Sequence, residues 1–107
     1  MADTNNGPTA PETEEVEVYS RDVNAWIVRT PGRKFPALVV QGDSFHQLFA
    51  LAHEICQRSE GVQDEELQRT AEELRDILWG RLLDYEEALG RHGFSLPYSR
   101  IDWRPGR

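Results

Sequence analysis

The chain has 107 residues, a formal net charge of −7 and one cysteine. This length predicts a single domain, because so short a chain has little room for a second core. The acidity disfavours a general nucleic-acid binder, which needs a surplus of Lys and Arg, and one cysteine excludes an intrachain disulfide. The sequence contains neither a leader-like nor a membrane-spanning apolar run, so we expect a cytoplasmic protein without membrane contact.

Composition divides the chain into three parts. Residues 1–14 hold hardly any large apolar side chain and are predicted to form a disordered N-terminal arm. Residues 15–98 carry the periodic apolar patterns and are predicted to form one α+β domain. Residues 99–107 are predicted to be a C-terminal tail.

Three strands are expected in the first half of the domain. Val16–Ser20 alternates apolar and polar residues, Ala25–Thr30 is rich in β-branched and aromatic residues, and an apolar run covers Phe35–Gln41. Pro31-Gly32 predicts a turn, and hence a hairpin, between the second and third strands, because Pro presets φ and Gly accepts positive φ. Pro36 is expected at a strand start or a sheet edge, where no ladder donor is needed.

A helix follows the third strand. Ser44 is expected to cap it, with Gln47 completing a capping box and Asp43 as the alternative cap. The helix should end near Ser59. Helical spacing places six residues on one wide apolar face: Phe45, Leu48, Phe49, Ala52, Ile55 and Cys56.

A second, longer helix is expected from a cap at Asp64 to about Gly90. Its apolar stripe consists of Leu67, Ala71, Leu74, Leu78, Leu82, Tyr85 and Leu89. Ile77, Trp79 and Leu83 lie beside this stripe, so the helix offers more apolar surface than one short sheet covers. A homodimer through this helix or a protein partner could use the excess. The predicted fold is therefore α+β, a three-stranded antiparallel meander followed by two helices.

The first helix also carries the residues that could support chemistry. His46, His53 and Cys56 fall near one another, but a structural zinc site needs four ligands and no CxxC or HExxH motif accompanies them. Cys56 lies on the apolar face, which disfavours its thiolate. We predict no catalytic, cofactor or metal residue and no enzymatic activity, with an enzyme of unrecognised site as an alternative.

Charge is distributed unevenly along the chain. Residues 64–91 contain nine acidic and four basic side chains, which are either a solvated helix face or a surface for a basic partner. Basic residues gather instead around the Pro31-Gly32 turn, where they protect a sheet edge, bind a protein or, as an alternative, bind nucleic acid. The candidate partner-binding residues are Arg29, Arg33, Lys34, Glu72, Glu73, Asp76 and Trp79.

Part of the sequence resembles the core of HicB-type antitoxins. The similar segments are Trp26-Ile-Val-Arg-Thr-Pro, Phe35-Pro36 and Gln41-Gly42-Asp43-Ser44, which leads into an amphipathic helix; the resemblance covers residues 26–56. Over its full length the chain is similar to small bacterial proteins of unknown function. The full-length resemblance implies a fold and no activity. Because some small acidic bacterial proteins of this sort act as antitoxins or immunity proteins, we expect the chain to neutralise a toxin. The sequence thus favours a non-enzymatic protein-protein interaction module, with a small regulatory nucleic-acid binder as the alternative.

Overall fold

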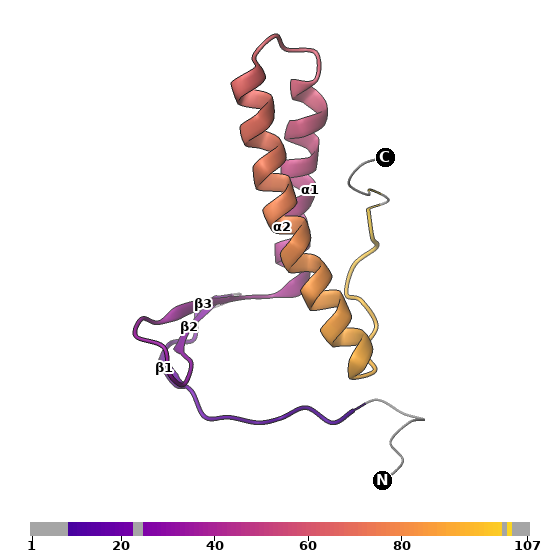
Figure 1. The fold of residues 1–107 in the computed structure, drawn as a ribbon. Coiled ribbons are helices and arrows are strands. Elements are labelled where there is room, and N and C mark those ends of the chain that lie inside the picture. Colours follow the sequence, from indigo (N-terminus) through magenta and orange to yellow (C-terminus); the bar gives the residue numbers. More distant parts are fainter. Residues whose placement is uncertain (1–8, 23–24, 102, 104–107) are drawn as a thin grey trace.

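A computed structural model describes residues 9–22, 25–101 and 103 (Figure 1). The three strands pair antiparallel in the order β1-β2-β3, and two helices follow them as an antiparallel hairpin. The elements are β1 (Glu17–Ser20), β2 (Ala25–Arg29), β3 (Ala37–Val40), α1 (Gly42–Ser59) and α2 (Glu65–Arg91). The predicted α+β fold, with a long second helix, is confirmed. Residues 1–8 of the expected arm and residues 102 and 104–107 of the expected tail lie outside the described residues.

The turn between β2 and β3 forms where the sequence predicts it. Gly32 has φ 79°, a conformation that side chains with a Cβ rarely adopt. Beyond this turn Val28 pairs with Ala37, and on its other side Val28 pairs with Val18 of β1. Pro36 lies immediately before β3, so its missing N–H does not interrupt the ladder.

The start of α1 differs from the predicted one. Neither Ser44 nor Asp43 caps the helix: α1 begins at Gly42, and Gln41 precedes it in an extended conformation without a side-chain cap. The reason is that Gly42 and Asp43 themselves adopt helical geometry, which places Ser44 inside the first turn. Asp43 still lies at the positive end of the helix dipole, where an acidic side chain is favourable.

The ends of α2 follow the sequence more closely. The Asp64 side chain accepts a hydrogen bond from the Leu67 amide at 3.0 Å, as a helix cap should. At the other end Gly93 takes φ 82°, and the Phe94 amide donates to the Leu89 carbonyl at 2.9 Å. This left-handed glycine ends the helix shortly after Gly90, as expected.

The core lies between the two helices. Phe49 and Cys56 of α1 and Leu82 of α2 have at most 2% of their surface exposed. In the described part of the sheet only Val28 is buried, because the sheet extends sideways from the start of α1 rather than packing beneath the hairpin (Figure 1). The radius of gyration is 17.5 Å, against about 13 Å for a compact chain of this length. The molecule is therefore elongated and leaves large surfaces uncovered.

Candidate functional site

The C-terminal segment, residues 96–101 and 103, turns back and runs alongside the helices (Figure 1). The Tyr98 ring stacks on His46 with ring centres 4.0 Å apart, and the Tyr98 hydroxyl donates to Glu86 at 2.8 Å. Arg100 also forms an ion pair with Glu86, at 3.1 Å. These contacts hold the C-terminal segment over one side of the hairpin.

An aromatic cluster continues along the same side. The Trp103 ring lies edge-on to Trp79 with ring centres 5.1 Å apart, and it also contacts Phe49 and His53. The Arg75 guanidinium lies over the Trp103 ring at 4.2 Å, within range of a cation–π interaction. Sequence reasoning assigned this tryptophan to the tail, because one aromatic residue among arginines carries no helical or strand periodicity.

Polar atoms inside this cluster are buried. His46 Nε2, His53 Nδ1 and Arg75 Nε have no hydrogen-bond partner among the described residues. Burial lowers the pKa of both histidines and raises the pKa of the Cys56 thiol. These directions favour neutral imidazoles and a neutral thiol near pH 7, so the cluster does not provide the thiolate–imidazolium pair of a cysteine nucleophile.

The opposite flank of α1 is exposed. Phe49 faces α2, whereas His46 and His53 are rotated toward the C-terminal segment. Because successive residues of a helix are separated by about 100°, Leu48 and Ile55 are rotated the other way. Both side chains remain nearly half exposed, although the sequence pattern placed them on the buried face.

The second helix divides in the same manner. Leu82 faces α1, and Trp79 and Glu86 contact the C-terminal segment. Leu74 and Ile77 are rotated to the other flank and are 46% and 56% exposed. Since the helices are antiparallel, the exposed flanks of α1 and α2 lie on the same side of the hairpin.

Together these flanks form one apolar surface, which we call the hairpin face. Its residues are Leu48, Leu51 and Ile55 of α1 and Leu67, Leu74 and Ile77 of α2, each between 42% and 56% exposed. The sequence indicated an excess of apolar residues on the second helix. It did not indicate the α1 contribution, because a single wide apolar stripe does not reveal which part of it the partner helix covers.

The acidic candidates lie beside this surface. Glu72, Glu73 and Asp76 line a shallow depression of about 420 Å³ on α2, together with Arg69 and Ile77. The structure therefore groups these three predicted residues. The fourth α2 candidate, Trp79, does not line this depression, and its ring is packed against Phe49 and Trp103.

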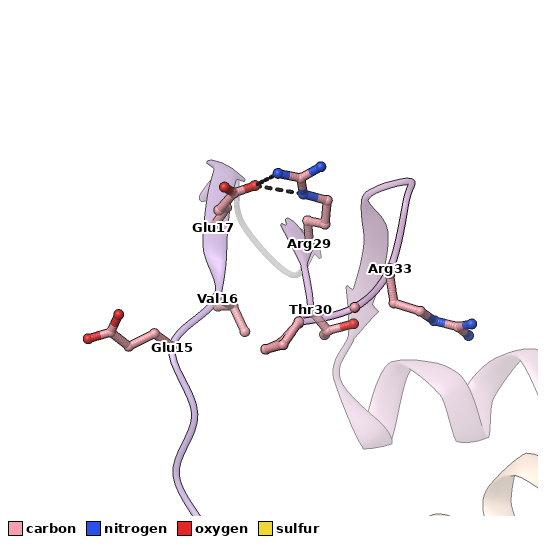
Figure 2. A pocket seen from close by; sticks show the side chains of 8 residues that line it. Glu15, Val16, Glu17, Arg29, Thr30 and Arg33 are labelled. Atoms are coloured by element: carbon pink, nitrogen blue, oxygen red, sulfur yellow. Dashed lines mark hydrogen bonds and ion pairs between the residues drawn. The ribbon is translucent and has the colours of Figure 1, made fainter.

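The basic candidates do not form one cluster either. Arg29 Nε donates to Glu17 at 2.7 Å, and this pair borders an open pocket of about 480 Å³ (Figure 2). The Tyr19 hydroxyl and Arg29 lower the pKa of Glu17, which keeps the pair ionised. Figure 2 shows Arg33 directed away from this pair. Lys34 lies 5.5 Å from the centre of the Phe35 ring.

A third hollow, a cavity of about 250 Å³, lies between β3 and the hairpin. Its walls are mostly apolar. They consist of Leu38, Val40, Gly42, Phe45, Leu82 and Tyr85, with Arg81. Sequence reasoning did not anticipate this cavity, because it depends on how the third strand meets the two helices.

The fold and these surfaces define a small α+β protein with uncovered apolar faces on both its sheet and its helices. The chain belongs to a family of unknown function, DUF6959, whose model matches residues 11–98. Neither a curated protein nor a solved structure matches the chain. In the part that the structure describes, no three metal-binding side chains come close enough to hold an ion, and no helix has the length and apolarity needed to cross a membrane.

Proposed function

We propose that this chain is a non-enzymatic protein-interaction module that binds its partner through the hairpin face. The observation that carries the proposal is the exposure of six Leu and Ile side chains, each about half exposed, which helical spacing places on the same side of the two helices. Isolated exposed apolar residues are ordinary, whereas a contiguous set typically marks an interaction site. The other side of the hairpin already holds the C-terminal segment, so the hairpin face is the helical surface available to a partner.

We further propose that the partner is a basic toxin, with the chain acting as an antitoxin or immunity protein in a bacterial cytoplasm. The acidic depression at Glu72, Glu73 and Asp76 supports this choice, because it borders the hairpin face at Ile77. An apolar centre flanked by charge of one sign selects a partner with an apolar centre and the opposite charge.

A second copy of the chain is the other occupant that suits this surface. Leu74 and Ile77 would then contact their counterparts, which gives a homodimer through α2. Two hairpins packed face to face would form a four-helix arrangement with the exposed Leu and Ile residues inside. Its acidic rims would repel each other, so the dimer should strengthen as salt increases.

The test replaces Ile77 by Glu and measures both partner recovery and mass. Tagged wild-type protein, expressed in its native host, is used for affinity capture with mass spectrometry, and light scattering gives the mass of the purified protein. Leu83→Glu is the matched control: Leu83 is 42% exposed on α2 but is rotated about 120° away from Ile77.

We expect the wild type and the control variant to recover the same partner, or to dimerise, and Ile77→Glu to do neither. The proposal would be contradicted if light scattering showed the wild-type protein to be a monomer and repeated affinity captures recovered no partner with it. Equal recovery by all three proteins would remove the hairpin face as the binding surface.

A further inference from the structure

Strand β3 forms one edge of the sheet. In the order β1-β2-β3 it pairs only with β2 among the described residues, and all four of its residues, Ala37–Val40, are apolar. Leu38 is 60% exposed and Val39 is 43% exposed, on opposite faces of the strand. Edge strands usually carry charged residues, bulges or a cover that prevents pairing with another chain. The opposite edge, β1, contains Glu17 and a register irregularity, whereas β3 has neither.

The 250 Å³ cavity lies directly beside this edge. The sheet contributes to it only Leu38 and Val40, both from β3, and Phe45 and Tyr85 contribute from the helices. In recognition by strand addition, the backbone of the edge strand binds the backbone of the peptide, and adjacent pockets receive alternate side chains. This cavity is positioned to receive one apolar side chain of an added strand.

Basic side chains lie at both ends of the same edge. Arg33 and Lys34 precede β3, and within the described part of the chain neither forms an ion pair. Arg81 of α2 lines the cavity together with Val40 and Gly42, at the end of β3 that leads into α1, and it contacts Asp84 at 3.2 Å on an exposed surface. A carboxylate on the incoming peptide would complement either end, because partner surfaces in specific complexes have opposite charges.

We propose that β3 binds an extended peptide segment of a partner protein, with an apolar centre and acidic residues at its ends. The segment adds to the sheet as a fourth strand, places one apolar side chain in the cavity beside Leu38, and directs a carboxylate to Arg33 and Lys34. The inference rests on the proposed protein-binding function and adds the chemistry of a partner at a second surface, separate from the hairpin face.

The probe is a blocked, fluorescently labelled peptide of eight residues, with four alternating Val and Ile residues between two Glu residues at each end. Its binding to the full-length chain is measured by fluorescence anisotropy. A second peptide with Lys in place of Glu tests the charge preference. Amide chemical shifts of the wild-type protein, recorded with and without the peptide, locate the contact without any substitution.

We expect saturable binding of the acidic peptide, with shift changes centred on Ala37–Val40. The Arg33→Glu, Lys34→Glu double variant should bind it at least about tenfold more weakly, because two attractive charges become repulsive. Arg58→Glu, Arg69→Glu is the matched control, since both arginines are exposed on the helices. Leu38→Ser should also weaken binding, whereas Val62→Ser, in the loop between the helices, should not.

Several results would overturn the inference. They are no binding of the acidic peptide, equal binding of the Lys peptide, or shift changes at the hairpin face instead of β3. Binding of a single-stranded oligonucleotide that the Arg33→Glu, Lys34→Glu variant loses would assign the basic turn to nucleic acid. A concentration-dependent dimer that Leu38→Ser abolishes would make a second copy the occupant. None of these results affects the Ile77→Glu test, so the two proposals fail independently.

Discussion

The helical hairpin and the sheet use their apolar residues in opposite ways. In the hairpin, Phe49 and Leu82 are fully enclosed, and the C-terminal segment covers one flank. In the sheet, Val28 is buried but Leu38 is 60% exposed, and no helix packs across either face (Figure 1). The hairpin therefore contains most of the buried apolar side chains, whereas the sheet presents apolar surface that a partner can bury.

Substitution of a phenylalanine in each region should give the largest difference in the free energy of unfolding. Replacing Phe49 by Ala should lower the free energy of unfolding by about 3–5 kcal/mol, because it removes a buried ring and leaves a cavity. Phe35, in the turn before β3, is 71% exposed, so Phe35→Ala should change that free energy by less than about 0.5 kcal/mol. Urea unfolding followed by circular dichroism measures both. Similar losses for the two variants would show that the sheet shares the core.

The C-terminal segment should stabilise the hairpin less than the buried core does. Trp103→Ala should lower the free energy of unfolding by about 2 kcal/mol, because the half-buried ring packs on Trp79 and beneath Arg75. Trp26→Ala, in the sheet, removes a ring that is 44% exposed and should cost less than about 1 kcal/mol. Thermal unfolding of the full-length variants compares them. If Trp103→Ala left the melting temperature unchanged, the C-terminal segment would not stabilise the hairpin.

The junction of sheet and hairpin should also contribute to stability. A Cβ at Gly42 would overlap the Tyr85 ring, so Gly42→Ala should cost about 1–3 kcal/mol through displacement of that ring. Gly80, in the middle of α2, has open space where a Cβ would lie, with no neighbouring atom within 4 Å. Gly80→Ala should therefore stabilise the protein by about 0.5–1 kcal/mol, and the two melting temperatures should move in opposite directions. A neutral Gly42→Ala variant would mean that Tyr85 moves freely and that the cavity beside β3 is adjustable.

Local sequence signals predicted the elements of this fold well. Alternation, the Pro31-Gly32 turn and the Asp64 cap depend on a few neighbouring residues, and the structure contains the corresponding strands, turn and cap. The start of α1 was missed because Gly42 and Asp43 are themselves helical, and Gly42 lies close to Tyr85, a residue 43 positions away. Capping rules consider only nearby residues and contain no such information.

The candidate surfaces depend on how segments that are distant in the sequence pack against one another, so the sequence predicted less of them. It identified Glu72, Glu73 and Asp76 as one surface, since neighbouring residues on a helix stay together. It grouped Trp79 with them by proximity alone, whereas the ring is turned toward Trp103. Only the packing of the C-terminal segment decides which helix flank is covered and which, like that of Leu51, remains exposed.

The smallest expected effect tests whether the covered flank responds to pH. Burial lowers the pKa of His46, with Glu86 opposing the shift, and burial together with Arg75 lowers the pKa of His53, with Glu60 opposing it. Histidines in the unfolded chain have a pKa of about 6.5. Between this value and the lower folded values, the unfolded chain binds more protons, so stability should decrease as pH falls from 7 to about 5.5.

Substitution of the stacked histidine isolates this contribution. His46→Phe keeps a ring against Tyr98 and removes the proton site, so the melting temperature of the variant should depend less on pH than that of the wild type. His92→Gln is the control, because its ring lies at the far end of α2, against the Thr9 carbonyl. If the melting temperature of His46→Phe depended on pH as strongly as that of the wild type, protonation of a group other than His46 would cause the loss of stability at low pH. A reduced dependence would instead show that the C-terminal segment holds the hairpin most firmly when the half-buried His46 imidazole is neutral, a constraint that the open sheet does not share.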